Sequence, residues 1–255
     1  MPVIKAQGAL STRCHNFQQD TAVSKLPPMN DSFAVRKRSR ALHRRNRTPE
    51  VSFLRALELD VIEHLEFFHA FIREPASVGA LSPSSRALAM AMIDGFDLRH
   101  ADTIVELGPG TGAFTGPILE RIGKHTTFFA MELDQIHARS LKRRFPGLAV
   151  YNDSAERVLE YLALHRKDTA DYVVSGLPWA NIPPDAQDRI MDEILTSLGS
   201  DGIFTTFAYL HARWLPKARQ FRRVLKQRFG CVETTPVIWR NLPPAFVYRC
   251  SQPKV

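Results

Sequence analysis

The sequence predicts an α/β protein with a mostly parallel, seven-stranded sheet, helices on both sheet faces, a C-terminal antiparallel hairpin and an N-terminal helical extension. Short apolar runs alternate with helical patterns from residue 102 onward, and the first of these runs ends in a glycine-rich segment. The last two apolar runs have no helix between them, which indicates the hairpin. The chain has 255 residues, 44% of them hydrophobic and 24% charged. These values are typical of globular proteins and exclude a fibrous or wholly disordered chain.

The first 50 residues differ in charge from the remainder of the chain. Residues 1–50 hold 10 Lys and Arg against 3 Asp and Glu, a local charge of +7, whereas residues 51–255 hold 24 against 23. Seven of the basic residues fall in the run 33–49, which contains no acid. We therefore expect residues 1–50 to form a basic, flexible arm that favours an anionic surface, whether nucleic acid, acidic lipid or acidic protein.

A second region, residues 51–100, has helical patterns. Apolar residues recur at three- and four-residue spacings from Val51 to Arg73, which predicts an amphipathic helix. A loop of small residues over Pro75–Ser85 and a helix over Arg86–Phe96 follow. An amphipathic helix after a basic arm can lie in a bilayer interface, so we expect this region to contact anionic lipid as well as the core.

The alternation of strand and helix patterns over residues 101–255 predicts one α/β domain. The expected strands are Thr103–Leu107, Thr126–Glu132, Leu148–Tyr151, Tyr172–Ser175, Ile203–Tyr209, Cys231–Trp239 and Phe246–Cys250. The expected helices are Phe114–Ile122, Gln135–Arg144, Ala155–His165, Ala186–Leu198 and Pro216–Phe229.

The most specific local pattern is the glycine-rich segment after the first strand. It starts at Glu106 and places glycines at 108, 110 and 112, just before a predicted helix. Glycines let the backbone turn tightly and approach a ligand, and a helix start offers free N–H groups. The spacing is GxGxG, which differs from the GxGxxG of dinucleotide-binding folds.

Two acidic residues end the next two predicted strands. Glu132 lies 20 residues after Gly112, a spacing that suits a carboxylate accepting two ribose hydroxyls. Asp153 follows the third strand. The glycine loop and both carboxylates therefore lie at three successive strand ends, where open α/β sheets bind ligands.

The segment VELGPGTG, residues 105–112, resembles motif I of the class I S-adenosylmethionine-dependent methyltransferases. The resemblance implies their Rossmann-like fold and S-adenosyl-L-methionine as cofactor. It implies that the three glycines line the methionine part, that Glu132 binds the ribose, and that Asp153 and Ser154 border the adenine. The further candidate cofactor ligands are Glu106, Leu133 and Ser175, with Ser82 and Ser84 in a loop that by resemblance folds over the cofactor.

The segment after the fourth strand resembles the NLPY motif of the rRNA adenine dimethyltransferases, which are a related class I family. In that family the Asn side chain and the proline carbonyl accept hydrogen bonds from the adenine amine, and the aromatic residue stacks on the base. Leu177, Pro178 and Trp179 match this motif, but Gly176 replaces the Asn. Glycine has no side chain to orient an adenine, so the departure counts against RNA, which stays as an alternative substrate.

Three separated segments resemble the bacterial phospholipid N-methyltransferases. They are SGLP at 175–178, GALSPSSRALA at 79–89 and WRNLPPAFVYR at 239–249. This resemblance spans about residues 51–250 and implies methylation of phosphatidylethanolamine toward phosphatidylcholine. Ornithine-lipid N-methyltransferases are close relatives that these motifs do not exclude. A non-enzymatic adaptor is a third alternative, which the intact glycine loop disfavours.

Methyl transfer to an amine needs a neutral nitrogen and a positioned acceptor. Tyr209 ends the fifth predicted strand and is a candidate hydrogen-bond partner or base for the amine, whereas Trp179 offers an aromatic face to methylated, cationic amines. Arg213 and His211 are candidates for the lipid phosphate, and Asn241 is a substrate-site candidate from the family motif alone. The structural alternatives are a Tyr packed at the sheet edge and solvated charges in a loop.

The cysteine spacing, the lengths of the apolar runs and the N-terminal sequence indicate where in the cell the protein acts. The three cysteines form no CxxC or Cys/His cluster, which predicts no metal site and favours a reducing compartment. No apolar run approaches the roughly 20 residues of a membrane span, and the N-terminus has no signal-peptide core. We expect a cytoplasmic protein that associates peripherally with the inner face of the membrane.

Overall fold

The computed structural model describes residues 83–254. The predicted basic arm, the predicted amphipathic helix over 51–73 and Ser82 lie outside the described residues. Among the described residues, no helix combines the length and the apolar character needed to cross a bilayer.

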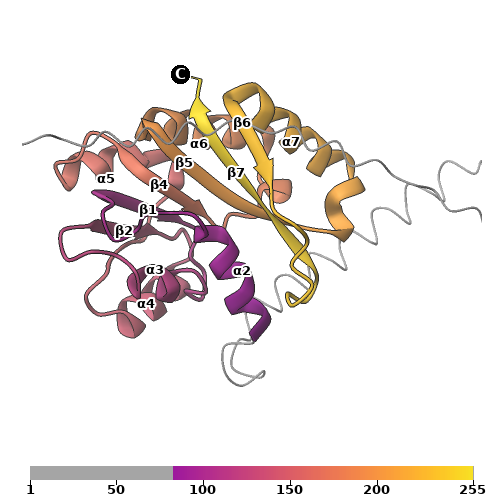
Figure 1. Ribbon diagram of the computed structural model, residues 1–255. Helices are drawn as coiled ribbons and strands as arrows, with labels where there is room; N and C mark the ends of the chain where they lie inside the picture. Colours follow the sequence, from indigo (N-terminus) through magenta and orange to yellow (C-terminus); the bar gives the residue numbers. More distant parts are fainter. Residues whose placement is uncertain (1–82, 255) are drawn as a thin grey trace, which may run out of the picture. The chain divides into compact units, whose positions relative to one another are not determined.

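Seven strands form one sheet in the order β3-β2-β1-β4-β5-β7-β6 (Figure 1). The strands are β1 Thr103–Leu107, β2 Thr127–Met131, β3 Ala149–Tyr151, β4 Ala170–Ser175, β5 Leu198–Tyr209, β6 Phe229–Thr234 and β7 Ala245–Pro253. β1 to β5 pair in parallel, and β7 pairs antiparallel with both β5 and β6. The predicted fold, including the C-terminal antiparallel hairpin, is confirmed.

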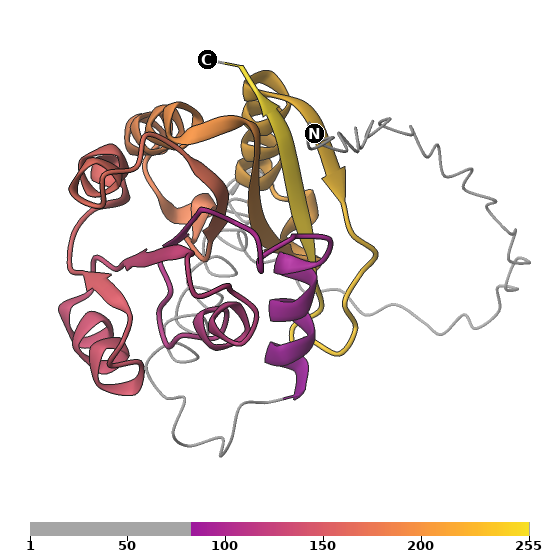
Figure 2. The ribbon, with the colours of Figure 1, turned by 60° about the vertical axis from the view of Figure 1, so that its left-hand side comes forward.

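Helices cover both faces of this sheet (Figure 2). The helices packed on one face are α2 Pro83–Ile93, α3 Thr115–Leu119 and α4 Gln135–Arg144. Those packed on the other face are α5 Val158–Leu164, α6 Pro184–Ser197 and α7 Pro216–Arg228. Three short 3-10 helices, η1 Ala155–Arg157, η2 Trp179–Asn181 and η3 His211–Trp214, connect these elements.

The two-sided packing follows from the strand sequences. Ile104 and Val105 are both fully buried, but they point into different core clusters on opposite sheet faces. A strand that is buried on both faces needs apolar residues at every position, and this continuous apolar pattern is what predicted the strands. Asp134 caps α4 by accepting the Ile136 and His137 amides, so this helix has the predicted bounds.

A helix and a strand end earlier than the sequence pattern predicts. The helix expected over 114–122 covers only Thr115–Leu119. Strand β6 ends at Thr234, two residues before Pro236, which has no N–H for a sheet ladder.

The strand order reverses between β1 and β4, and both strands end at the same sheet edge. Leu107 pairs with Ser175, and Ser175 pairs in turn with Thr206 of β5. Segments that follow β1, β2, β4 and β5 therefore meet at one edge, which is where open α/β sheets bind ligands.

Candidate functional site

The glycine loop after β1 has open space at one of its three glycines. Gly108, Gly110 and Gly112 all have positive φ, at 65°, 55° and 83°. A Cβ on Gly108 would lie 2.7 Å from the Leu177 side chain, and one on Gly112 would lie 2.7 Å from the Phe145 ring. A Cβ on Gly110 would meet nothing within 4 Å. Gly110 is therefore the position where the backbone is exposed to an approaching ligand.

Glu132 is held against this loop. Its Oε2 accepts a hydrogen bond from the Gly110 amide at 2.9 Å, and its Oε1 accepts from the Asp134 amide at 2.9 Å. Glu132 as a whole is 8% exposed. A buried carboxylate thus lies beside the one open glycine, as expected for a group that receives ligand hydroxyls.

Glu106 adds a second carboxyl that is fully buried. Its Oε2 accepts a hydrogen bond from the Thr115 hydroxyl at 2.7 Å, whereas its Oε1 has no hydrogen-bond partner. Burial raises the pKa of Glu106 to about 8. An unpartnered buried oxygen is costly, and here it lies two residues before the glycine loop.

The segments after β2 and β3 form the other side of the site. The Tyr161 hydroxyl donates to Asp153 at 2.6 Å and, ahead of the Ser154 amide and Arg157, holds the pKa of that carboxyl below its ordinary value. Ser154 caps η1 through its side chain, and Leu133 is 74% exposed. Asp153 is thus ordered by its own neighbours and Leu133 opens to solvent.

Asn152 was not identified from the sequence. Its side-chain amide donates to the carbonyls of Glu132 and Leu133, each at 2.9 Å, and so joins the segment after β3 to the segment after β2. No motif marks this residue; its only signal is that it precedes Asp153 at a strand end.

Trp179 differs from its prediction. The ring is 3% exposed, stacks on Phe221 with centroids 4.9 Å apart, and donates from Nε1 to the Ser175 hydroxyl at 3.1 Å. Both ring faces therefore belong to the core in this structure, and the aromatic face expected for a methylated amine is not presented. Ser175, which is fully buried, likewise acts by anchoring this indole.

Gly176 packs directly on the glycine loop. Its amide donates to the Leu107 carbonyl at 2.8 Å, and a Cβ at this position would lie 2.4 Å from the Gly108 carbonyl oxygen. The glycine that replaces the Asn of the NLPY motif is therefore required by the contact between two backbones.

Gly176→Ala is expected to lower the free energy of unfolding by about 1–3 kcal/mol, because overpacking forces the two loops apart. Cofactor affinity should fall with it. Urea denaturation and calorimetric titration measure the two effects. Gly147→Ala is the matched control, since a Cβ there would meet nothing within 4 Å. Equal stability of the two variants would contradict the packing argument.

Tyr209 lies at the end of β5 and is half-buried. Its ring stacks on His211 with centroids 5.7 Å apart, and burial raises the pKa of its phenol to about 12. Tyr209 packs in the cluster beneath α2 and α3, whereas Trp179 packs in the cluster beneath α6 and α7. The structure does not bring the two predicted catalytic residues together.

The remaining candidates have different surroundings. His211 and Arg213 lie on η3 and are exposed. Asn241 is 7% exposed and donates from Nδ2 to the Pro243 carbonyl at 2.7 Å, so its amide stabilises its own turn. Ser84 falls within the first turn of α2, which starts at Pro83. Among the described residues, no group of His, Cys, Asp or Glu is arranged to hold a metal ion.

Comparisons with known proteins give two kinds of sequence relative. No family model matches the chain. It is 28% identical over 190 residues to an ornithine lipid N-methyltransferase of Singulisphaera acidiphila, covering 72% of this chain and 93% of that protein. It is 30% identical over 89 residues to a ribosomal RNA small subunit methyltransferase A of Ralstonia nicotianae, covering 35% of this chain and 31% of that protein.

Solved structures resemble the fold of this chain over about two thirds to three quarters of its length. A TehB-like SAM-dependent methyltransferase from Corynebacterium glutamicum has a TM-score of 0.51 at 18% identity, covering 74% of this chain and 98% of that one. The spermidine synthase of Thermotoga maritima has a TM-score of 0.52 at 11% identity, covering 67% and 60%. At these identities the likeness concerns the fold alone.

Proposed function

We propose that this chain, an S-adenosylmethionine-dependent methyltransferase with the class I fold, methylates the amine head group of a membrane lipid. The observation that carries the proposal is the extent of the alignment to the ornithine lipid N-methyltransferase, which includes 93% of that protein. We favour phosphatidylethanolamine, converted toward phosphatidylcholine, as the acceptor because of the three motifs at 79–89, 175–178 and 239–249. Ornithine lipid is the alternative within the same class.

RNA is the less favoured acceptor. The alignment to the ribosomal RNA methyltransferase includes only 31% of that protein. Gly176 also lacks the side chain that would orient an adenine amine, and its contact with Gly108 leaves no room for one without a backbone shift. The proposal therefore assigns the chain to lipid amines.

The glycine-loop site fits S-adenosylmethionine on two observations. Gly110 has open space at its Cβ position, and the buried Oε1 of Glu106 has no partner. We assign the ribose hydroxyls to Glu132, the methionine part to the glycine loop, and the cationic end of the cofactor to Glu106. When bound, the cofactor supplies a methyl group activated on a sulfonium.

The protein must position a neutral amine for this transfer, since only the free base has a lone pair. The pKa of Tyr209, raised to about 12, keeps its phenol protonated at neutral pH, so Tyr209 is a poor base. We therefore keep the hydrogen-bonding role for Tyr209, in which the phenol oxygen orients the amine. Positioning and exclusion of water then supply most of the rate increase.

Tyr209→Phe is expected to lower kcat by about tenfold, the order of one lost hydrogen bond, while leaving cofactor affinity unchanged. For both proteins kcat should rise with pH across the neutral range as the lipid amine loses its proton. The phenol should add no inflection below pH of about 10. Steady-state rates in mixed micelles, with calorimetric titration of the cofactor, measure these effects. A wild-type kcat in Tyr209→Phe would remove this residue from the mechanism.

Exposed apolar side chains lie near the carboxyl ends of the strands, where the candidate site also lies. Five of the six large hydrophobic side chains that are most exposed in the described residues follow the carboxyl ends of strands. They are Leu133, Ile136, Trp214, Trp239 and Leu242, each at least 71% exposed. Two of the five are Trp, a residue that is enriched at membrane interfaces. The position of these side chains at the carboxyl ends of the strands supports peripheral contact between this part of the protein and the membrane that holds the acceptor.

The test of the proposal uses the full chain, radiolabelled S-adenosylmethionine and separate acceptors. The acceptors are phosphatidylethanolamine in mixed micelles, ornithine lipid in mixed micelles, micelles without aminolipid, and ribosomal RNA. Label in either aminolipid is expected, and chromatography then counts the methyl groups and identifies the preferred lipid. Label in RNA alone would overturn the proposal.

A further inference from the structure

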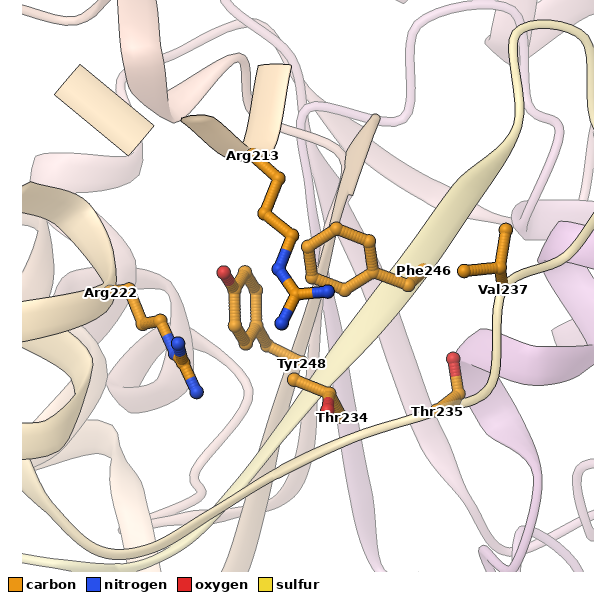
Figure 3. Close-up of a pocket in the computed structure, with 7 residues that line it drawn as sticks. All are labelled: Arg213, Arg222, Thr234, Thr235, Val237, Phe246 and Tyr248. Carbon is orange, nitrogen blue, oxygen red and sulfur yellow. The ribbon is translucent and has the colours of Figure 1, made fainter. Parts of the chain in front are cut away.

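A pocket lies between η3, α7 and the hairpin of β6 and β7 (Figure 3). It holds about 330 Å³ of empty space, counting its open mouth. Two arginines reach it from different elements, Arg213 from η3 and Arg222 from α7. Their side chains approach the Tyr248 ring from two sides. The pocket therefore brings two positive charges to one hollow.

This pocket is separate from the candidate cofactor site. Phe246 and Tyr248 belong to the core cluster beneath α6 and α7, whereas Tyr209 packs beneath α2 and α3. In the strand order, β4 and β5 lie between β1, which precedes the glycine loop, and β7, which carries the floor of the pocket. Three steps between neighbouring strands span roughly 14 Å. A ligand in the pocket thus lies outside the site of methyl transfer.

The pocket nevertheless lies near the same ends of the strands as the candidate site. β5 and β6 both pair antiparallel with β7, so their carboxyl ends meet the start of β7. Trp214 follows Arg213 directly and is 71% exposed. Trp239 lies two residues after Val237, which lines the pocket, and is 72% exposed. Since Trp is enriched among lipid head groups, both neighbours of the pocket suit a membrane surface.

Neither arginine has a carboxylate partner. Within residues 83–254, no Asp or Glu oxygen lies within 4.0 Å of the Arg213 or Arg222 guanidinium. Arg228 of the same helix as Arg222, in contrast, pairs with Asp192 at 2.9 Å. Two cations that face one hollow without an anion favour an anionic ligand.

The surroundings of the pocket are also basic. Helix α7 contains six Lys and Arg and no Asp or Glu. Glu233 precedes the pocket residue Thr234 on β6, so the alternation of side chains along the strand places this carboxylate on the opposite face. Acidic phospholipids attract basic protein surfaces. The charge around the pocket therefore favours an acidic phospholipid over a zwitterionic one.

Two hydroxyl groups complete the lining. Burial raises the pKa of the Tyr248 phenol, and the charges of Arg222 and Arg213 oppose that rise, so both cations act at this hydroxyl. Thr235 Oγ1 accepts a hydrogen bond from the Val247 amide at 3.0 Å, which leaves its own O–H proton to donate elsewhere. The pocket thus combines charged and neutral donors, which suits the oxygens of a phosphate group.

The elements that form the pocket are fixed to one another. Arg219 of α7 donates to the Trp214 carbonyl from Nε at 3.0 Å and from Nη2 at 2.7 Å, which ties α7 to η3. Tyr248 is 4% exposed, and its ring packs edge-on against Phe246 and Phe221 with centroids 5.1 and 6.4 Å apart. Because the frame is already ordered, less conformational entropy is lost when a ligand binds.

We propose that this pocket binds the phosphate of an acidic bilayer phospholipid that is not the acceptor, with Arg213 and Arg222 as its cations and the Tyr248 and Thr235 hydroxyls as donors. The choice of a membrane lipid as the ligand rests on the proposed function. A lipid bound there holds η3 and the hairpin at the membrane surface, where the acceptor amine also lies. No bond is made or broken at this site.

Co-sedimentation of the full chain with vesicles tests the site without cofactor or acceptor. The vesicles contain phosphatidylcholine alone or mixed with phosphatidylglycerol. Arg222→Gln and Arg213→Gln should each weaken binding to the mixed vesicles about tenfold, the order of one lost charge-assisted hydrogen bond. Arg223→Gln is the matched control, because Arg223 is exposed on the same helix and does not line the pocket. Equal losses in Arg222→Gln and Arg223→Gln would show diffuse charge attraction only and overturn the site.

Soluble ligands identify what the pocket recognises. Calorimetry on the full chain compares dihexanoylphosphatidylglycerol below its micelle concentration, inorganic phosphate and a ribosomal RNA hairpin. The short-chain lipid should bind, and Arg222→Gln should weaken it about tenfold. Inorganic phosphate that binds as tightly would make this a free-phosphate site and overturn the lipid assignment. RNA binding that depends on Arg222, with vesicle binding that does not, would overturn it in favour of nucleic acid.

The failure of this site and the failure of the proposed function are distinguishable. Vesicle binding that depends on Arg222, in a chain that methylates no lipid, would overturn the proposed function and leave the phosphate site in place. Methylation of an aminolipid, with equal vesicle binding by Arg222→Gln and Arg223→Gln, would overturn the phosphate site alone. Both arginines are exposed, so neither substitution disturbs the core.

Discussion

Glu132→Ala should weaken S-adenosylmethionine binding by about 100-fold. The variant loses two hydrogen bonds to a charged acceptor, each worth about 1.5–3 kcal/mol, and tenfold in affinity corresponds to about 1.4 kcal/mol. The loss lies at the lower end of that range, because the Gly110 and Asp134 amides already donate to this carboxylate and must exchange partners when the cofactor binds. Calorimetric titration with S-adenosylmethionine and with S-adenosylhomocysteine measures the change.

Two further variants sharpen this result. Glu132→Gln keeps one acceptor oxygen and should lose about tenfold. Glu233→Ala removes an exposed carboxylate on the edge strand β6 and should leave affinity unchanged. Wild-type affinity in Glu132→Ala would mean that the ribose is held elsewhere.

Glu106→Gln should remove a large pH dependence of stability. The carboxyl has a pKa of about 8 in the folded chain against 4.5 as the ordinary value, so the folded state binds its proton more tightly than the unfolded state. Its contribution to the free energy of unfolding is therefore full below pH of about 4.5 and is lost as pH rises to about 8. At about 1.36 kcal/mol for each pH unit, the loss approaches 5 kcal/mol.

Urea denaturation at pH 5, 7 and 9 measures this effect as the difference between wild type and Glu106→Gln. The variant should gain stability relative to wild type as the pH rises, because its amide does not ionise. Glu233→Gln serves as the exposed control and should parallel wild type throughout. Parallel curves for Glu106→Gln would mean that Glu106 is already ionised in the folded protein.

The sequence predicted the sheet well because its strands are short apolar runs with clear breaks. β1 and α4 have the predicted bounds, since glycines end the first and Asp134 caps the second. Strand β6 was predicted too long because the apolar pattern continues past Pro236, which has no N–H for a sheet ladder. The apolar pattern likewise continues past Leu119, where α3 ends.

The part of the candidate site that lies at the carboxyl ends of the strands was predictable from the sequence. The glycine loop and Glu132 meet as expected because parallel strands bring their carboxyl ends to one edge. Side-chain direction beyond the strands was not predictable. Nothing in the segment around Trp179 tells that its indole turns inward to Phe221, since that contact joins residues 42 positions apart.

The backbone contact between Gly176 and Gly108 also limits how acceptor preference can change in this fold. An Asn at position 176, as in the rRNA adenine dimethyltransferase motif, would place its Cβ 2.4 Å from a carbonyl of the cofactor loop. The substitution Gly176→Asn alone would therefore displace the glycine loop that is assigned to the cofactor. It would do so whether or not the new side chain could bind a base. A change from the proposed lipid acceptor to nucleic acid would need the loop at 108–112 to move as well. An engineered conversion would therefore have to combine the substitution at position 176 with a change in that loop.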